Sequence, residues 1–309
     1  MSGGILAAGS VASQDKMPSW EEFGRSDKLQ QAFVTGASKA KHWEEPAEPV
    51  AIAGPVHFVG TRGLGVYLIT TAEGHILINT AMQGSGPEIA ASIRKLGFKP
   101  EDVRILLTNH GHVDHVAGHA HVVGLSHATV YSSAADVEVM QSGGTKDYFY
   151  GKVPAFRYDP VRVDKVLKSG DRIRLGGVEL LALETPGHSN AAVTFVMDTE
   201  VDGRKLRFVF PDGTGVNPGY RLLKDPNYPG IVDDYRRTFA TLGALKPDIW
   251  LSSHTEYMDF DAKRAKANTD GVSAWIDPEG YRAFLSVQRE AFDARIAAES
   301  KGVEGGRGN

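Results

Sequence analysis

The chain has 309 residues, of which 41% are hydrophobic and 23% are charged, and it contains no cysteine. This composition is typical of a globular protein with one large domain or two small ones. The absence of cysteine excludes disulfides and thiolate metal sites. The formal net charge is −4 and there is no long basic run, so we expect no nucleic-acid partner.

The first 40 residues are polar, and we expect them to form a flexible lead. Within "MSGGILAAGSVASQDK", the stretch "GILAAGSVA" resembles the end of a secretory signal peptide, and cleavage after Ser13 would suit its small residues. A basic segment before it is missing. We therefore interpret residues 1–40 as a lead with a candidate signal-peptide remnant, and expect a periplasmic or secreted protein. No apolar run reaches the roughly 18 residues of a membrane span.

The next part of the chain alternates strands with one marked helix. Apolar periodicity and turn residues predict strands at 56–60, 65–71, 75–80 and 103–109. Between the last two, "SGPEIAASIRKLG" predicts a helix over 85–97, with Ser85 as its N-cap and Gly97 at its end.

The rest of the chain is rich in strands, and helices punctuate it. We expect helices from about 116, at 134–144, 231–245 and 277–300, and strands at 128–133, 168–185, 191–198, 205–210 and 248–254. This pattern favours an α/β (α+β) sandwich with helices outside rather than a regularly alternating sheet. No short repeat or internal linker is visible. The sequence therefore predicts one domain over residues 41–300 and a disordered tail over 301–309.

Histidines are concentrated directly after the apolar strand "VRILL". The stretch "TNHGHVDHVAGH" follows it, and in an extended loop the side chains of His110, His112 and Asp114 project to one side. His115 comes next, at the expected start of a helix. A buried imidazole without a partner is costly, so this arrangement requires either solvent or a metal ion.

Two later strands also end in histidine: "LALETPGHS" supplies His188 and "IWLSSH" supplies His254. Loops at strand ends are where a rigid scaffold assembles a site. Imidazole and carboxylate ligands suit zinc, and six of them can serve two ions with open positions. We expect the remaining histidines not to be ligands: His42, His57, His75, His119, His121 and His127. Of these, we expect His119 and His121 to be exposed.

The string "HGHVDH", followed by "TPGHS" and "SSH", resembles the metallo-β-lactamase superfamily. The blocks "SGGTKDYFYGK", "PDGTGVNPGYRL" and "DDYRRTFATLGALKPDIWL" narrow the resemblance to class B, subclass 3 metallo-β-lactamases, over about residues 43–297. The resemblance implies an αββα sandwich, with the site at one edge between two sheets. It also implies that His110, His112 and His188 hold a first zinc ion, and that Asp114, His115 and His254 hold a second.

The activity implied is opening of the β-lactam ring of antibiotics by a zinc-bound hydroxide, with Asp114 orienting this nucleophile as the catalytic residue. Two zinc ions, one carboxylate and one hydroxide leave a charge of about +2, which would attract an anionic substrate. We expect a monomer. The alternative is another hydrolase of the same fold, such as a lactonase or thioesterase, and a binding protein without catalysis is a third hypothesis.

One departure from the family favours that alternative. The related enzymes usually carry serines that bind the substrate carboxylate where Gly213 and Gly215 stand here. Thr214, Asn217 or a backbone N–H are candidate replacements. Asp212 aligns with a metal-bridging aspartate of other hydrolases in the superfamily, such as glyoxalase II, whereas in the lactamase-like interpretation it lies behind the ligands.

One aromatic residue is a candidate for contact with the substrate. Tyr150, in "DYFYG", can form a loop wall for an apolar substrate group or can simply pack the loop. Tyr235, Phe239 and Leu242 have helical spacing, and we interpret them as core residues.

Overall fold

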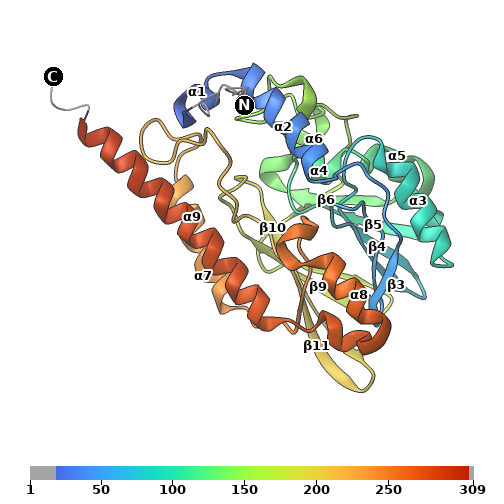
Figure 1. The fold of residues 1–309 in the computed structure, drawn as a ribbon. Coiled ribbons are helices and arrows are strands. Elements are labelled where there is room, and N and C mark those ends of the chain that lie inside the picture. The colour runs from blue at the N-terminus through green and yellow to red at the C-terminus, as the bar shows by residue number, and fades with distance from the viewer. Residues whose placement is uncertain (1–18, 306–309) are drawn as a thin grey trace, which may run out of the picture.

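The computed structural model describes residues 19–305, and side chains up to residue 301. Two β-sheets pack face to face, and helices cover their outer faces (Figure 1). This confirms the predicted αββα sandwich. The candidate cleavage site at Ser13 and the last four residues of the predicted tail lie outside the described residues.

The first sheet has the order β1-β2-β3-β4-β5-β6-β7. The first four strands are antiparallel and the last four are parallel. Their bounds are β1 Val50–Ala53, β2 Val56–Phe58, β3 Tyr67–Thr71, β4 Gly74–Ile78, β5 Val103–Leu107, β6 Thr129–Ser133 and β7 Lys165–Leu167.

The second sheet has the order β12-β11-β10-β9-β8 and is antiparallel except for the β11–β12 pair. Its strands are β8 Arg172–Leu175, β9 Val178–Glu184, β10 Val193–Val201, β11 Arg204–Phe210 and β12 Ile249–Trp250. The helices are α1 Trp20–Gly24, α2 Asp27–Ala40, α3 Ser85–Lys95, α4 Val113–Val116, α5 His119–Ser126, α6 Val137–Gln141, α7 Ile231–Ala244, α8 Phe260–Asp270 and α9 Pro278–Gly305.

Strand β4 of the first sheet is buried along its whole length. In β4, Ile76 and Ile78 join the core between the two sheets, whereas Leu77 joins the core beneath the outer helices. Successive side chains of a strand point to opposite faces, so the unbroken apolar run in β4 serves two cores at once. This double burial makes the strand a rigid support for the loop at its end.

The carboxyl ends of β4, β5, β9, β11 and β12 lie at one edge of the sandwich. The parallel pairs β4–β5 and β11–β12 end together, and β9 runs parallel to β11 because both are antiparallel to β10. The chain segments that follow these strands therefore converge at that edge.

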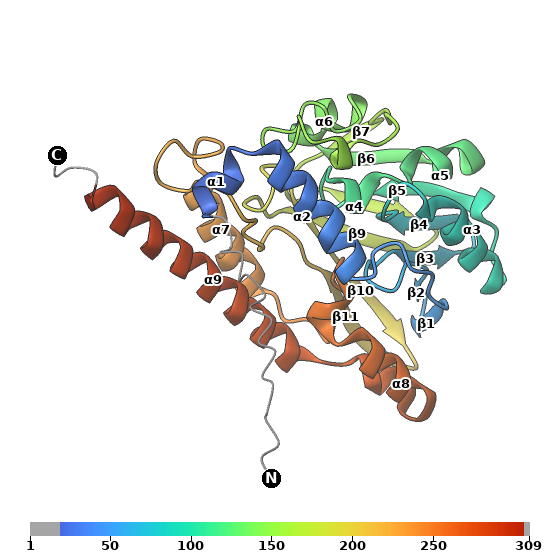
Figure 2. The ribbon, with the colours of Figure 1, turned by 45° about the horizontal axis from the view of Figure 1, so that its top comes forward.

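The expectation of a flexible lead is wrong from residue 19 onward. Ser19 and Glu22 form a reciprocal capping box at the start of α1, and the side chain of Ser26 caps α2. Phe23 and Val34 are buried, and this burial anchors both helices. Figure 2 shows α2 between α9 and the strands of the first sheet.

Two helix boundaries also differ from the prediction. Ser85 lies inside the first turn of α3, and Gly84 is the N-cap, without a side-chain cap. The predicted tail is wrong over residues 301–305, because α9 continues to Gly305. None of the described helices, the 28-residue α9 included, combines the length and apolar content that crossing a bilayer requires.

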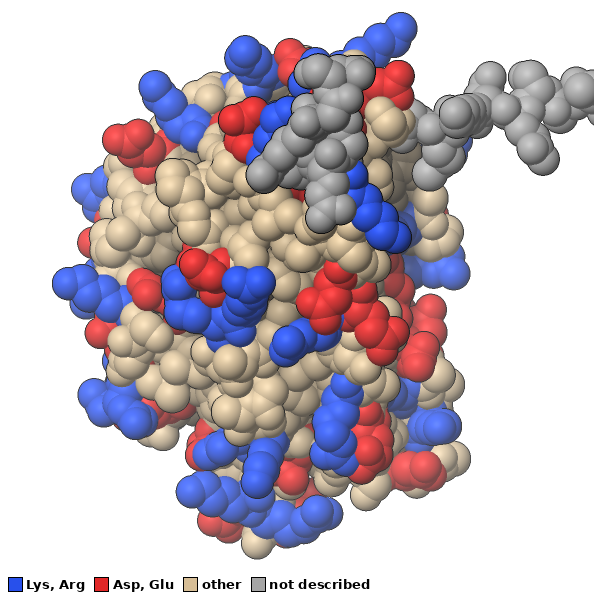
Figure 3. Space-filling model, turned by 90° about the vertical axis from the view of Figure 1, so that its left-hand side faces the viewer, with Lys and Arg blue, Asp and Glu red and all other residues tan. Residues whose placement is uncertain are grey.

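Surface charge is mixed on the side of the molecule where α9 lies in Figure 1. Figure 3 shows Lys and Arg interspersed with Asp and Glu on this face. Interspersed charges of opposite sign largely cancel beyond a Debye length of about 8 Å. The net charge of −4 is therefore not gathered into one strong patch on this face.

Candidate metal centre

Two triplets of side chains meet at the edge where the strands end. The first consists of His110, His112 and His188, and the second of Asp114, His115 and His254; within each triplet, potential ligand atoms lie within 4.8 Å of one another. Thus the structure brings together all six side chains named from the sequence.

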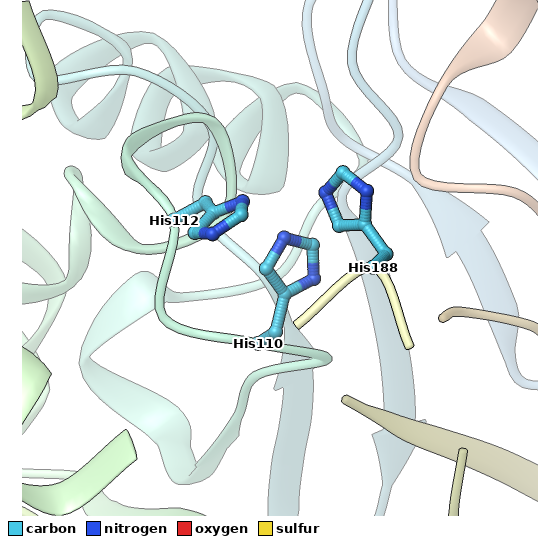
Figure 4. A group of neighbouring side chains, drawn as sticks. All are labelled: His110, His112 and His188. Carbon is cyan, nitrogen blue, oxygen red and sulfur yellow. The ribbon is translucent and has the colours of Figure 1, made fainter. Parts of the chain in front are cut away.

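The first triplet joins the loop after β5 to the loop after β9. Figure 4 shows the rings of His110, His112 and His188 gathered around a common space. The centroid of the His110 ring lies 4.4 Å from that of His112 and 4.8 Å from that of His188. The ring centroids of His112 and His188 are 5.0 Å apart. This spacing suits three imidazoles around one cation.

The second triplet centres on the carboxylate of Asp114. Its Oδ2 lies 3.7 Å from Nε2 of His115 and 3.5 Å from Nε2 of His254. These distances exceed those of ordinary hydrogen bonds but leave space for an ion between the three atoms. The rings of His110 and His115 have centroids 3.9 Å apart, so the two triplets are adjacent.

Unpartnered nitrogens indicate that a cation fits this centre. Nε2 of His110 and Nε2 of His115 are buried and have no hydrogen-bond partner among the described residues. Buried polar atoms normally have partners, because an unpaired one costs about 1–3 kcal/mol. A cluster of such imidazole nitrogens beside a carboxylate is the donor set that zinc prefers.

Groups behind the triplets orient three of the rings, two through hydrogen bonds and one through a longer contact with a carboxylate. Nδ1 of His110 donates to Oδ2 of Asp212 at 2.6 Å, and Nδ1 of His188 donates to the carbonyl of Gly215 at 2.9 Å. Nε2 of His112 lies 3.5 Å from Oδ2 of Asp147. A partner on one ring nitrogen fixes the tautomer and aims the other nitrogen at the ion.

Burial sets the protonation of most of these histidines. It lowers the pKa of His110 and His115 well below the usual value, aided by the neighbouring imidazoles, and lowers the pKa of His188 to about 4 and of His254 to about 3. They are therefore neutral at pH 7, which is the state that binds metal.

The carboxylates behind the rings respond differently to their surroundings. Burial raises the pKa of Asp212 to about 8. Burial acts in the same direction on Asp147, but hydrogen bonding to His112 and to the backbone N–H groups of Tyr150 and Phe149 outweighs it and leaves its pKa lowered. A buried carboxylate with several donors stays charged, so Asp147 is a fixed negative group behind His112.

A buried polar network ties three strand ends together beneath the site. Nδ2 of Asn79, after β4, donates to Oδ1 of Asn109 at 2.7 Å and to Oγ of Ser253 at 3.0 Å. Ser253 also donates to Asn109, at 3.1 Å. The network links the segments that carry His110 and His254, so it fixes the spacing of the two triplets.

The candidate centre opens into a cavity of about 290 Å³. Asp212, Thr214, Asn217 and Tyr150 all line it, together with side chains from α2 and α9. Tyr150 is fully buried and stacks on Phe156, with ring centroids 4.0 Å apart. Tyr150 thus both packs the loop and borders the cavity. The two roles that the sequence offered for it, loop packing and a wall for the substrate, are therefore compatible.

The two glycines of "PDGTG" differ in whether their surroundings leave space for a side chain. Gly213 has a φ of +93°, and a Cβ there would lie 1.7 Å from the carbonyl oxygen of Thr185. Only glycine fits such a position. At Gly215 a Cβ would lie 3.3 Å from Nδ1 of His188, which is close but not blocked. The backbone therefore explains the missing serine at 213.

Sequence reasoning missed several residues and misplaced one. Asp147, Asn79, Asn109 and Ser253 act through partners distant in sequence, and no local signal marks them. The expectation that His119 is exposed is wrong: it is fully buried, and its Nδ1 lies 2.7 Å from Oγ1 of Thr80.

Residues 65–254 match the family model described as "Metallo-beta-lactamase superfamily". Among solved structures, the chain is similar to BJP-1, a subclass B3 metallo-beta-lactamase of Bradyrhizobium japonicum, with a TM-score of 0.80 and 33% identity over 85% of this chain and 99% of that one. It is also similar to the FEZ-1 metallo-beta-lactamase from Legionella gormanii, with a TM-score of 0.81 and 36% identity over 83% and 98%.

Curated relatives with other names are more distant. A hydroxyacylglutathione hydrolase of Fuscovulum blasticum is 24% identical over 63% of this chain and 64% of its own length. An N-acyl homoserine lactonase of Bacillus cereus is 27% identical over 45% of this chain and 60% of its own length. This chain therefore spans under two thirds of the length of these curated relatives.

Proposed function

Because the chain belongs to the metallo-beta-lactamase superfamily, we propose that it is a zinc-dependent hydrolase that opens the β-lactam ring. The observation that carries the proposal is the meeting of the two triplets at one cavity. Similarity to subclass B3 enzymes over nearly their whole length supports the choice of substrate. The fold and the centre by themselves indicate a metal-dependent hydrolase.

We propose two zinc ions per chain, one for each triplet. The first would be held by His110, His112 and His188, and the second by Asp114, His115 and His254. Bound zinc supplies a nucleophile from water at neutral pH and polarises the carbonyl that is attacked. The unpartnered buried Nε2 atoms of His110 and His115 support this assignment.

The protein's own groups position the reactants. In this proposal, Oδ2 of Asp114 faces His115 and His254, and its other oxygen would accept a hydrogen bond from the nucleophile and orient it. Asp212 and the carbonyl of Gly215 keep Nε2 of His110 and His188 directed at the first ion. This prior alignment lowers the barrier, because little reorganisation remains for the reaction itself.

The cavity walls set the environment of the substrate. Phe33 and Val34 of α2, Tyr150, Phe156 and Val216 line it with apolar groups. Such walls exclude water from the scissile bond and pack against an apolar substituent of the substrate. We propose that a substituted, anionic β-lactam meets both requirements.

Hydrolysis of a lactone or thioester at the same centre is the second candidate. The curated hydroxyacylglutathione hydrolase and N-acyl homoserine lactonase favour it. Asp212 favours the first candidate, because its carboxylate accepts a hydrogen bond from His110 instead of joining either group of candidate ligands.

The test compares four substrates with the zinc-loaded protein: nitrocefin, imipenem, an N-acyl homoserine lactone and a glutathione thioester. We expect the two β-lactams to be hydrolysed and the other two to react much more slowly. His188→Ala should remove turnover and first-site zinc together, whereas His121→Ala, at an exposed histidine, should change neither. Preferential hydrolysis of the lactone or thioester would replace the first candidate with the second.

We also propose that the protein is exported to the periplasm or secreted, and that it is a monomer. Fractionation of cells producing the full chain tests its location, and light scattering of the purified protein tests its oligomeric state. A cytoplasmic or dimeric product would contradict these two proposals without affecting the proposed chemistry.

A further inference from the structure

The cavity has one cationic corner. Lys41, the residue that follows α2, is the only lysine or arginine among the described side chains that line the cavity. Its neighbours there include Tyr257 on the segment after His254 and Gln288 on α9. All three side chains can donate hydrogen bonds. This corner has the chemistry of an anion site.

Contacts on two sides fix the position of Lys41. Its ammonium pairs with the carboxylate of Glu256 and lies 6.0 Å from the ring centre of Tyr257. The ring of Tyr257 in turn packs edge-on against His254, with centroids 5.6 Å apart. The ammonium is thus held one aromatic ring away from the second triplet.

Lys41 has hydrogen-bond donors to spare. An ammonium has three N–H donors, and Glu256 is its one hydrogen-bond partner among the described residues. Burial would lower the pKa of Lys41, but Glu256, Tyr257 and Asp114 outweigh it and raise the pKa, so the group is charged at neutral pH. Its side chain is 41% exposed, which leaves room for a ligand to approach.

The turn after β11, which also contributes to the lining, lacks an equivalent cationic group. The turn after β11 presents Gly213 and Gly215, and the backbone at 213 excludes any side chain. On the same side as Lys41, α2 adds Phe33, Val34 and Ala37 to the lining. The helix therefore offers an apolar wall that leads to a positive end.

We propose that Lys41 binds the carboxylate of the substrate, while the neighbouring face of α2 packs against its apolar substituent. The inference rests on the proposed hydrolysis of an anionic substrate and adds to it a specificity-determining residue. It also names the substrate class: carboxylates with an apolar group, and not their neutral esters. Tyr257 and Gln288 are positioned to add hydrogen bonds to the same carboxylate.

Calorimetry with a metal-binding probe tests this without requiring turnover. The probe is 2-mercapto-3-phenylpropanoic acid, whose thiolate binds zinc, and it is compared with its methyl ester on the zinc-loaded full chain. We expect wild type to bind the acid more tightly than the ester. Lys41→Met should reduce this preference by about tenfold, the effect of losing a charge-assisted hydrogen bond, while leaving the affinity for the ester within about twofold.

Lys39→Met is the matched control. Lys39 is exposed in the last turn of α2, two residues before Lys41, and it does not line the cavity. It should retain the wild-type preference, and thermal unfolding should show that both variants are folded. A Lys41→Met protein that keeps the full preference, or a wild type that does not distinguish acid from ester, would overturn the proposal. Hydrolysis of nitrocefin is measured separately, so failure of the proposed function is distinguishable from failure of this anchor.

Discussion

Oδ2 of Asp212 accepts a hydrogen bond from Nδ1 of His110 at 2.6 Å, across 102 residues of sequence. The bond directs Nε2 of His110, which is buried and unpartnered, toward the space shared with His112 and His188. The position of Asp212 at the end of β11 and that of His110 after β5 connect the two sheets. A single contact thus links the packing of the sandwich to the geometry of the candidate metal centre.

Replacing Asp212 should therefore weaken zinc binding without removing a ligand. We expect Asp212→Asn to reduce affinity for the first ion by about 10–100-fold, because an amide holds the ring less firmly. Competition with a chelating dye measures this. Asp233→Asn, on the exposed side of α7, is the control, and equal zinc affinities for the two variants would contradict the role given to Asp212.

The two glycines near the site should respond differently to serine. We expect Gly213→Ser to destabilise the zinc-loaded protein by roughly 3 kcal/mol or more, because the new Cβ would overlap the carbonyl of Thr185 at a positive φ. Gly215→Ser should cost only about 1 kcal/mol. Urea unfolding measures both. A Gly213→Ser protein as stable as wild type would refute this account of the missing serine.

The metal-free protein should lose stability in mild acid. Buried histidines with lowered pKa values, such as His188 (about 4), His254 and His119 (each about 3), stay neutral in the folded state, whereas unfolded histidines take up protons below about pH 6.5. Between pH 6.5 and about 4.5 the unfolded chain therefore binds more protons, and stability falls as pH falls, by up to about 1.4 kcal/mol per pH unit for each such histidine.

Two carboxyl groups oppose this trend. The pKa values of Asp212, at about 8, and Asp136, at about 7, are raised by burial, so the folded state holds protons there that the unfolded chain releases. The histidines with lowered pKa values are more numerous, and the net slope keeps the sign stated above. Urea unfolding of the chelated protein at several pH values measures it, and constant or rising stability toward pH 4.5 would contradict the burial of these imidazoles.

The ligand candidates were predictable from the sequence because their signals are local. His110, His112, Asp114 and His115 lie within six residues, and His188 and His254 each follow a recognisable strand. The resemblance to the metallo-β-lactamase superfamily then implied how the six divide between two ions. Apolar periodicity and turn residues predicted an α/β sandwich with helices outside, and the family resemblance implied its αββα order.

Residues that act across long sequence distances were not predictable in the same way. Asp147 reaches His112 only because the loop after α6 folds back, and Asn79 pairs with Ser253 across 174 residues. Helices α1 and α2 are a different case. Their serine caps were readable in the sequence, but their polar composition concealed the few apolar residues that anchor them, and Lys41 was overlooked with them.

Titration of the metal-free protein with zinc, with imipenem hydrolysis recorded at each step, tests the central claim most directly. We predict that hydrolysis appears as zinc binds and reaches its maximum at two equivalents per chain. A protein that binds two equivalents without hydrolysing imipenem would contradict the proposed function, and one that binds no zinc would contradict the metal centre itself.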